Sequence, residues 1–243
     1  MNPNIAIAIL LITFVLLIMI KCPITFSMII STAFTMLYIQ VPVMTLVQQM
    51  SKQLNSFSLL AIPFFILMGE IMAAGGISSR LLAFANVCVG QITGGLAHVN
   101  VLASMLFGGI SGSAIADVSS LGALEIPMME EAGYEKDFSI AVTVASSCQG
   151  LIIPPSHNMV LYSMVAGGVS VGSLFCAGYI PGIMLGVFIM GMCYIISKKK
   201  HYPKGKKLPF KEALRVTKDT FFAMLAMVII IGGVSAGFFT ATE

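Results

Sequence analysis

Charged side chains are scarce in this sequence. Asp, Glu, Lys and Arg make up 9% of the 243 residues, whereas soluble domains carry about 25%. Hydrophobic residues make up 58%, and the mean hydropathy is +0.98. This composition excludes a soluble domain, and the lack of short alternating segments excludes a transmembrane β-barrel. We therefore predict an all-α integral membrane protein, a bundle of several spanning helices.

Other patterns are also missing. The net charge of +3 does not indicate a nucleic-acid partner, because the lysines are gathered largely in one loop. No cysteine belongs to a CxxC pair or has a histidine at metal-binding spacing, so we predict buried cysteines without a disulfide or a metal. The apolar run from Ile5 lacks a basic leader and a small-residue cleavage site, which predicts a retained first helix and not a signal peptide. The five cysteines are Cys22, Cys88, Cys148, Cys176 and Cys193.

Long apolar runs predict the membrane-spanning helices. A more polar stretch at 42–56 is expected at a surface, and residues 79–93, too short to span comfortably, are expected to form a connecting arm. Alternating the sides of the membrane from an outside N-terminus puts Lys21, Arg80, Lys136 and the basic residues of 198–218 inside, and only Lys52 outside. The predicted spans are residues 4–20, 24–39, 57–74, 171–196 and 220–239.

Between the third and fourth of these spans, residues 96–107 form an apolar segment of about 12 residues. Such a helix rises only about 18 Å, whereas the hydrocarbon core is about 30 Å thick. We predict that it stops at Gly108-Gly109, turns at a tip rich in serine and glycine, and returns as a second helix over 113–131. This pattern predicts a re-entrant helical hairpin that enters from the cytoplasmic side. Its non-helical tip must be buried in protein or face a cavity.

The segment after the hairpin is long enough to span but contains Pro154-Pro155. Two prolines remove two backbone donors and interrupt a helix. We predict two half-helices, 138–151 and 156–166, with an unwound joint between them. Such discontinuous helices hold ions and substrates in secondary transporters, because the joint exposes carbonyl groups and the second half-helix presents its positive N-terminus.

Four motifs in this sequence resemble one known family. They are Ile62-Pro-Phe-Phe-Ile-Leu-Met-Gly69, Phe107-Gly-Gly-Ile-Ser-Gly-Ser-Ala-Ile-Ala-Asp117, Ile152-Ile-Pro-Pro-Ser156 and Gly178-Tyr-Ile-Pro-Gly182. They resemble the large membrane subunit of the TRAP (tripartite ATP-independent periplasmic) transporters, from the first span to the last residue.

The resemblance implies a sodium-driven importer of organic acid anions, such as C4-dicarboxylates or sialic-acid-like substrates, in the bacterial inner membrane with a periplasmic N-terminus. It implies two protein partners, a small membrane subunit and a periplasmic substrate-binding protein, and transport by an elevator movement against a scaffold. It implies no enzyme activity and no cofactor beyond Na⁺ as the coupling ion. Expected domains are the scaffold spans and arm (1–93), the hairpin and broken helix of the transport domain (94–170) and further spans (171–243).

The sequence departs from the family pattern in two ways. The family's large subunit is about twice as long and contains two inverted repeats, so a fragment, a split gene or a frameshifted gene is expected, and an inactive or partner-only chain is an alternative function. In addition, His157-Asn158 stands where many family members carry apolar residues.

The predicted site lies where the hairpin tip meets the joint. For sodium we predict ligands from Ser111, Gly112, Ser113, Gly150 and Pro155, because hard cations prefer oxygen ligands. For the substrate carboxylate we predict Ser111, Asp117, Ser156, His157 and Asn158.

Simpler roles are possible for each polar residue. The serines can permit close helix packing, Asp117 can cap a helix, and His157 and Asn158 can be packing residues. Glu70 is favoured as an interfacial residue, and Glu125 can pair or extend to the membrane surface. A remote alternative is a rhomboid-like intramembrane serine protease, because Gly109-Ile-Ser-Gly112 fits a GxSG motif with His157 downstream.

Overall fold

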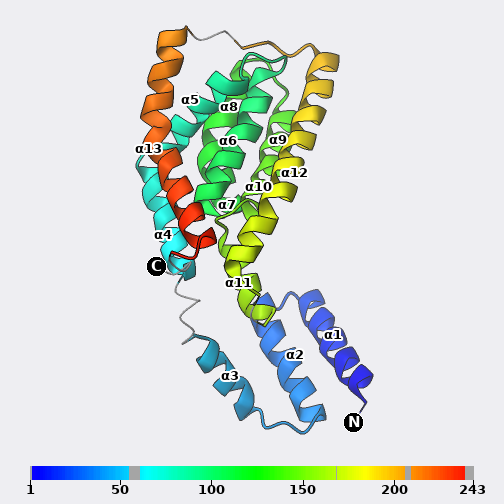
Figure 1. Cartoon of the computed structure of the whole chain (residues 1–243). Helices are drawn as coiled ribbons and strands as arrows, with labels where there is room; N and C mark the ends of the chain where they lie inside the picture. The colour runs from blue at the N-terminus through cyan, green and yellow to red at the C-terminus, as the bar shows by residue number, and fades with distance from the viewer. Residues whose placement is uncertain (1, 55–60, 168, 206–208, 239–243) are drawn as a thin grey trace. The chain divides into compact units, whose positions relative to one another are not determined.

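The computed structural model describes residues 2–54, 61–167, 169–205 and 209–238. Every regular element in these ranges is a helix, and one isolated bridge joins Thr93 to Lys204. The all-α prediction is therefore confirmed. The chain divides into two compact units, residues 1–56 and 57–243, which are described separately below (Figure 1).

The first unit contains three helices. α1 (Pro3–Met19) packs along α2 (Ile24–Tyr38), and α3 (Met44–Leu54) follows. The proline at the first position of α1 suits a helix start, because its missing N–H group has no intrahelical partner there. The first two predicted spans agree with these helices to within one residue at each end.

The second unit begins with two helices and a helical hairpin. The predicted third span begins at Phe57, which lies outside the described residues. The hairpin returns through a short helix, a π-helical turn and a longer helix. These elements are α4 (Ala61–Ala74), α5 (Ile77–Val89), α6 (Gly95–Ser111), α7 (Ala114–Asp117), η2 (Val118–Gly122) and α8 (Ala123–Glu131).

A broken helix and two long helices complete this unit. The prediction of an interrupted segment around Pro154-Pro155 is confirmed, with helical halves inclined by 51°. The predicted spans 171–196 and 220–239 correspond to longer helices that begin or end in the basic segment, and the predicted end at Phe239 lies outside the described residues. These elements are α9 (Lys136–Ser147), α10 (Gln149–Ile152), α11 (His157–Val165), α12 (Val171–Lys200) and α13 (Phe210–Ser235).

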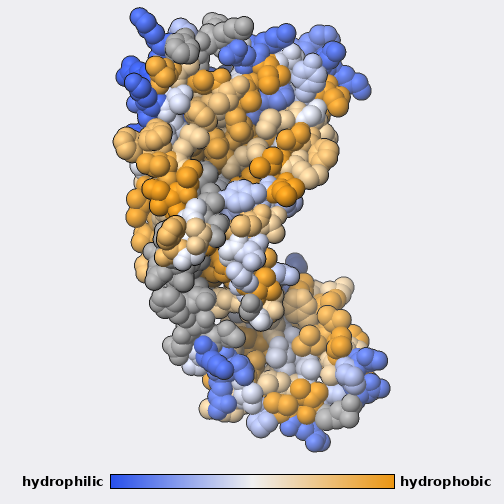
Figure 2. Space-filling view, in the orientation of Figure 1, coloured by the Kyte–Doolittle hydropathy of each residue, from blue (hydrophilic) through white to orange (hydrophobic). Residues whose placement is uncertain are grey.

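The lengths and apolar character of the helices fit a membrane protein. Among the described residues α12 is long and apolar enough to cross a bilayer alone, and the number of spans rises to three if each of two bent pairs is one span. The bent pairs are α4 with α5, and α9–α10 with α11. In Figure 2 the hydrophilic residues of this unit gather at the end where α12 stops, and hydrophobic residues cover its flank.

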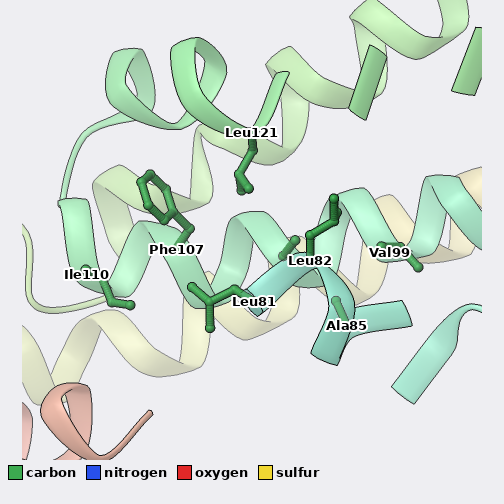
Figure 3. Packing of buried hydrophobic residues seen from close by; sticks show 8 residues of the cluster. Leu81, Leu82, Ala85, Val99, Phe107, Ile110 and Leu121 are labelled. Carbon is green, nitrogen blue, oxygen red and sulfur yellow. The ribbon is translucent and has the colours of Figure 1, made fainter. Parts of the chain in front are cut away.

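The core of the second unit lies between α5 and the hairpin. Leu81, Leu82 and Ala85 of α5 pack against Val99, Ala103, Phe107 and Ile110 of α6 and against Leu121 of η2 (Figure 3). These eight side chains are buried, so the outgoing and returning legs of the hairpin share one packed core with α5.

The predicted helix break at Gly108-Gly109 is wrong. α6 continues through both glycines and ends at Ser111, with 17 residues and a length of about 26 Å at 1.5 Å per residue. The glycines stay helical because they let α6 approach the broken helix closely: a Cβ on Gly108 would lie 2.4 Å from the Cα of Gly150. The chain leaves the helix at Gly112, where φ is +61°.

Candidate functional site

Two residues, Gly112 and Ser113, separate α6 from α7 at the tip of the hairpin, which is held by its own polar atoms. Gly112 adopts the left-handed conformation that favours glycine, and its N–H donates to the carbonyl of Gly108 at 2.8 Å. Ser113 caps α7, because its Oγ accepts from the N–H of Ala116 at 3.4 Å. The Ser111 Oγ lies 3.4 Å from the carbonyl oxygen of Ser113 and accepts from the Ser113 N–H at 3.3 Å. The tip therefore gathers several oxygen atoms within one turn of chain.

The joint of the broken helix is an extended segment between α10 and α11. Ile153 takes an extended conformation, the Pro154-Pro155 bond is cis, and α11 begins at His157. The Ser156 Oγ donates to the carbonyl of Leu151 at 2.9 Å and is fully buried. The hydroxyl of Ser156 therefore serves the joint itself.

The tip and the joint pack directly against each other. A Cβ built on Gly112 would lie 3.0 Å from the Pro155 carbonyl oxygen, the Ser156 Cα and the His157 backbone nitrogen. A Cβ built on Gly150 would lie 3.8 Å from the Ser113 carbonyl oxygen. Two backbone breaks more than 35 residues apart in the sequence thus meet at glycines, and the carbonyls of Ser113 and Pro155 lie in this contact zone.

A cavity of about 490 Å³ opens beside this contact. Of the predicted site residues, it is lined by Ser111, Ser113 and His157, whereas the others lie elsewhere around the tip and joint. The Nδ1 atom of His157 is buried without a hydrogen-bond partner, so the ring has one unused polar atom. The remaining lining residues are Ile66, Gly69, Glu70, Phe107, Ile115, Ala116, Ser119 and Ser120.

Glu70 is a cavity residue that the sequence did not favour as functional. It lies on α4, is exposed, and brings a carboxylate to a cavity otherwise lined by apolar and hydroxyl side chains and by the imidazole of His157. In the sequence, Glu70 stood out only as a charged residue in an apolar helix, seven residues after Pro63. Its position did not show that α4 faces the hairpin tip, because only the tertiary fold brings the two together.

Asp117 occupies a different position from the one predicted for a substrate residue. It ends α7, is 1% exposed, and does not line the cavity. Its carboxylate faces Ser104 of α6, inside the hairpin. Glu125 of α8 is also buried, at 3% exposure.

A buried polar network joins the outgoing leg of the hairpin to the broken helix. The Asn100 Nδ2 donates to the Thr143 Oγ1 at 2.7 Å, the Ser146 Oγ donates to the Asn100 Oδ1 at 2.7 Å, and the Ser104 Oγ donates to the Ser146 Oγ at 3.1 Å. All four side chains are at most 1% exposed. Sequence reasoning missed this network, since its partners are more than 40 residues apart.

Comparison with known proteins identifies the family. Residues 11–243 match the model of the DctM component of the tripartite ATP-independent periplasmic transporters. The chain belongs to this family. Membership confirms the resemblance to the large membrane subunit of these transporters.

Individual relatives agree with this assignment. The chain is 42% identical to the protein YgiK of Salmonella typhimurium, over 95% of the chain and 54% of that protein. It is 44% identical to the sialic acid TRAP transporter large permease SiaM of Vibrio cholerae, over 91% and 52%. It is 43% identical to the C4-dicarboxylate TRAP transporter large permease DctM of Pseudomonas aeruginosa, over 77% and 44%. The chain thus spans about half the length of the curated relatives it matches.

The serine protease hypothesis is not supported. Ser111 and His157 line the same cavity, but within the described residues no hydrogen bond joins them, and the Ser111 hydroxyl is engaged with Ser113. The GxSG motif has a structural role at the tip, where its last residue, Gly112, adopts the left-handed conformation that ends α6.

Proposed function

We propose that this chain forms part of a sodium-coupled secondary transporter that imports organic acid anions across the bacterial inner membrane. The observation that carries the proposal is the meeting of the hairpin tip and the unwound joint beside one cavity. Secondary transporters bind ions and substrates at such paired interruptions, because free carbonyls and helix N-termini become available inside the membrane.

The sodium ion is proposed to lie between Ser111–Ser113 and the joint. The Ser111 hydroxyl and the carbonyls of Ser113 and Pro155 are oxygen atoms, which hard cations prefer. Gly112 and Gly150 contribute by having no side chain, since a Cβ at either position would enter the space between the two backbones. The oxygens at this place fit a small cation better than an anion.

The substrate carboxylate is proposed to bind in the cavity next to the ion. His157 and Asn158 form the first turn of α11, whose N-terminus favours negative charge. Ser111 and His157 line the cavity, whereas Ser156 and Asp117 are buried and do not line it. Sialic acid and C4-dicarboxylates, named for two relatives, are both carboxylates. Glu70 adds a negative charge at the cavity, and we expect it to disfavour dianionic substrates.

The assembly is proposed to follow the family plan. The hairpin is re-entrant from the cytoplasmic side, the N-terminus is periplasmic, and the hairpin moves with the broken helix in elevator fashion. A small TRAP membrane subunit and a periplasmic substrate-binding protein are the proposed partners. The arrangement of basic residues at the end of the hairpin unit where α12 stops supports this orientation.

The test is uptake of labelled sialic acid and succinate by proteoliposomes that contain the chain, the remaining part of a relative's large subunit and both partners. Ser111→Ala is expected to raise the sodium concentration needed for half-maximal uptake about tenfold or more, because one ligand of a buried charged ion is worth about 1.5–3 kcal/mol. Ser79→Ala is the matched control, since Ser79 is exposed on α5 and bonds only to the Gly76 carbonyl. Unchanged sodium dependence in the Ser111 variant contradicts the ion site.

A further inference from the structure

The last turn of α12 carries three lysines that differ in their surroundings. Lys200 forms an ion pair with Glu135, which lies before α9. Lys198 and Lys199 are exposed and have no ion-pair partner within the parts of the chain that the structure describes. α12 itself contains no Asp or Glu. Two positive charges therefore lie at the end of an apolar helix with no acidic group of the described chain to neutralise them.

A surface hollow of about 440 Å³ lies directly beside these two lysines. Its lining comes from one side of the last two turns of α12, because residues four apart in a helix are neighbours. Tyr194 is 44% exposed and Ile195 is 63% exposed. The hollow therefore combines two cations, an aromatic ring and a branched aliphatic side chain. Its lining residues are Tyr194, Ile195, Lys198 and Lys199.

Exposed apolar side chains continue from the hollow along the same face of α12. They precede Lys199 at intervals of four, three and four residues, the spacing of one helical face. The members of this apolar stripe are Phe188, Met192 and Ile195, each more than half exposed. From Phe188 to Lys199 the stripe rises about 17 Å, which is close to one leaflet of a hydrocarbon core about 30 Å thick. The buried residues of α12 lie on its other side.

This arrangement of charge and apolar surface matches a phospholipid with an anionic headgroup. The hydrophilic residues of this unit gather at the end where α12 stops (Figure 2), so the lysines lie at the level of the headgroups. Lysine and tyrosine side chains place their polar ends there and cover apolar surface with the rest of the side chain. Basic pockets at this level bind acidic headgroups. A free phosphate ion would use the lysines but leave the apolar stripe without a partner.

A second basic hollow of the same unit is less suited to such a lipid. It is lined by Arg80, Lys218, Asp219 and Phe222. The carboxylate of Asp219 lies among its cations and lowers the net positive charge that an anionic headgroup would meet. No acidic residue lines the hollow on α12.

We propose that the hollow on α12 binds one phospholipid with an anionic headgroup, such as phosphatidylglycerol. Lys198 and Lys199 hold the phosphate, and one acyl chain lies along the apolar stripe. This lipid site is separate from the proposed ion and substrate sites. It depends on α12 crossing the bilayer and does not depend on the identity of the transported anion.

The test uses the absence of tryptophan from the sequence. Tyr194→Trp places a unique fluorophore at the hollow, and phospholipids with brominated acyl chains quench tryptophan that they contact. The full chain is reconstituted in phosphatidylcholine nanodiscs that contain a small, equal fraction of brominated phosphatidylglycerol or brominated phosphatidylcholine. The anionic lipid is expected to occupy the site about tenfold more, and to quench more strongly, because each lysine favours an acidic headgroup several-fold.

Variants of the same reporter chain identify the groups that carry this preference. Lys198→Gln with Lys199→Gln is expected to abolish the preference. The matched control, Lys136→Gln with Lys211→Gln, removes the same charge from exposed positions on α9 and α13 and is expected to keep it. Phe34→Trp reports instead from α2, where no charged residue lies within one turn, and is expected to be quenched equally by both lipids.

A second reporter covers any disturbance of the contact between the Tyr194 and His98 rings. Ile195→Trp at the same hollow is expected to show the same preference. Equal quenching by the two lipids at both reporters overturns the proposal, and so does a preference that survives the loss of Lys198 and Lys199. Equal loss of preference in the matched control would show only a general attraction to an anionic bilayer and also overturns the site. Weak quenching by both lipids would show that protein covers this face, with the same consequence.

These outcomes are independent of ion coupling. Failure of Ser111→Ala to alter sodium activation would contradict the sodium site and leave the lipid site untouched.

Discussion

At the scale of single residues, glycines decide whether the tip and the joint can meet. Gly112 meets two separate requirements for glycine, one of backbone conformation and one of space. Its φ of +61° favours glycine, and the place of its missing Cβ is 3.0 Å from three backbone atoms of the joint. Gly133 has a φ of +88° but open space around it. Comparing substitutions at Gly112 and Gly133 therefore distinguishes the effect of backbone strain from the effect of steric contact.

Gly112→Ala is expected to destabilise the chain by more than Gly133→Ala. Both variants pay about 1–2 kcal/mol for a side chain in the left-handed region. Only the Gly112 variant must also push the joint away, because backbone atoms cannot rotate aside as side chains can. Thermal unfolding in detergent measures the difference. Equal losses of stability would show that the tip and joint do not press on each other.

At the scale of elements, the polar network fixes the hairpin to the broken helix. α6 and α9 are joined by Asn100, Thr143, Ser104 and Ser146, all fully or almost fully buried. In a membrane the hydrophobic effect contributes little to the association of helices, so hydrogen bonds of this kind help to hold them together. We expect the hairpin and the first half of the broken helix to move as one body.

Asn100→Ala is expected to destabilise the chain by about 1–3 kcal/mol, because it leaves the buried Ser146 hydroxyl without its acceptor. A double-mutant cycle with Thr143→Ala should give a coupling energy of about 0.5 kcal/mol or more. Ser120→Ala serves as the control, since its hydroxyl bonds only to the Ala116 carbonyl of the same leg. Strict additivity of Asn100→Ala and Thr143→Ala would contradict the network.

A second inter-element contact lies at the solvent end of the hairpin. Tyr202 stacks on Tyr134 with ring centroids 4.3 Å apart, and its hydroxyl accepts from the Glu135 N–H at 3.4 Å. Lys200 and Glu135 form an ion pair, and the hydrogen bond from Lys200 to Glu135 raises the pKa of Lys200. The segment after α12 is thus tied to the loop between α8 and α9.

Tyr202→Ala is expected to release this segment. Loss of the stacked ring and of one hydrogen-bond acceptor should make the peptide bonds after Lys199 and Lys200 several times more susceptible to trypsin. Glu135→Gln, which removes the ion pair but keeps both cleavage sites, should have a much smaller effect, because that ion pair is exposed. The raised pKa of Lys200 means that this small contribution is present at neutral pH and is lost as the pH rises through that pKa. Equal rates of proteolysis of wild type and Tyr202→Ala would show that the stacked ring does not hold this segment in place.

At the scale of the whole molecule, the cavity is bordered by surface that this chain leaves uncovered. Ile115 at the tip is 81% exposed, and Glu70 is exposed across the cavity. The chain covers about half the length of its relatives. Binding sites built from paired repeats close only when both repeats meet.

We therefore expect the 243-residue chain alone to give no sodium-dependent uptake and to run as a polydisperse sample in size-exclusion chromatography. Co-expression with the segment of a relative that lies beyond the matched region should give a monodisperse complex and restore uptake. Uptake by the chain alone would contradict this expectation and would indicate that two copies supply the two repeats.

The sequence by itself determined the class of protein, most helix positions and the two interruptions. Low charge and long apolar runs require helices in lipid, and Pro154-Pro155 must break a helix wherever it is placed. The residues around Gly108 did not reveal where α6 ends. Glycines weaken a helix unless another backbone packs closely against them, as Gly150 does against Gly108.

Only the tertiary structure decided which polar residues share a site. Ser111, His157 and Glu70 line the same cavity, whereas Asp117 is buried in the hairpin core. Sequence spacing gives the face of a helix that a residue occupies, yet the partner across that face comes from a segment tens of residues away. The hydrogen bonds that Asn100 and Ser104 make across to α9 exist only once α6 and α9 are side by side.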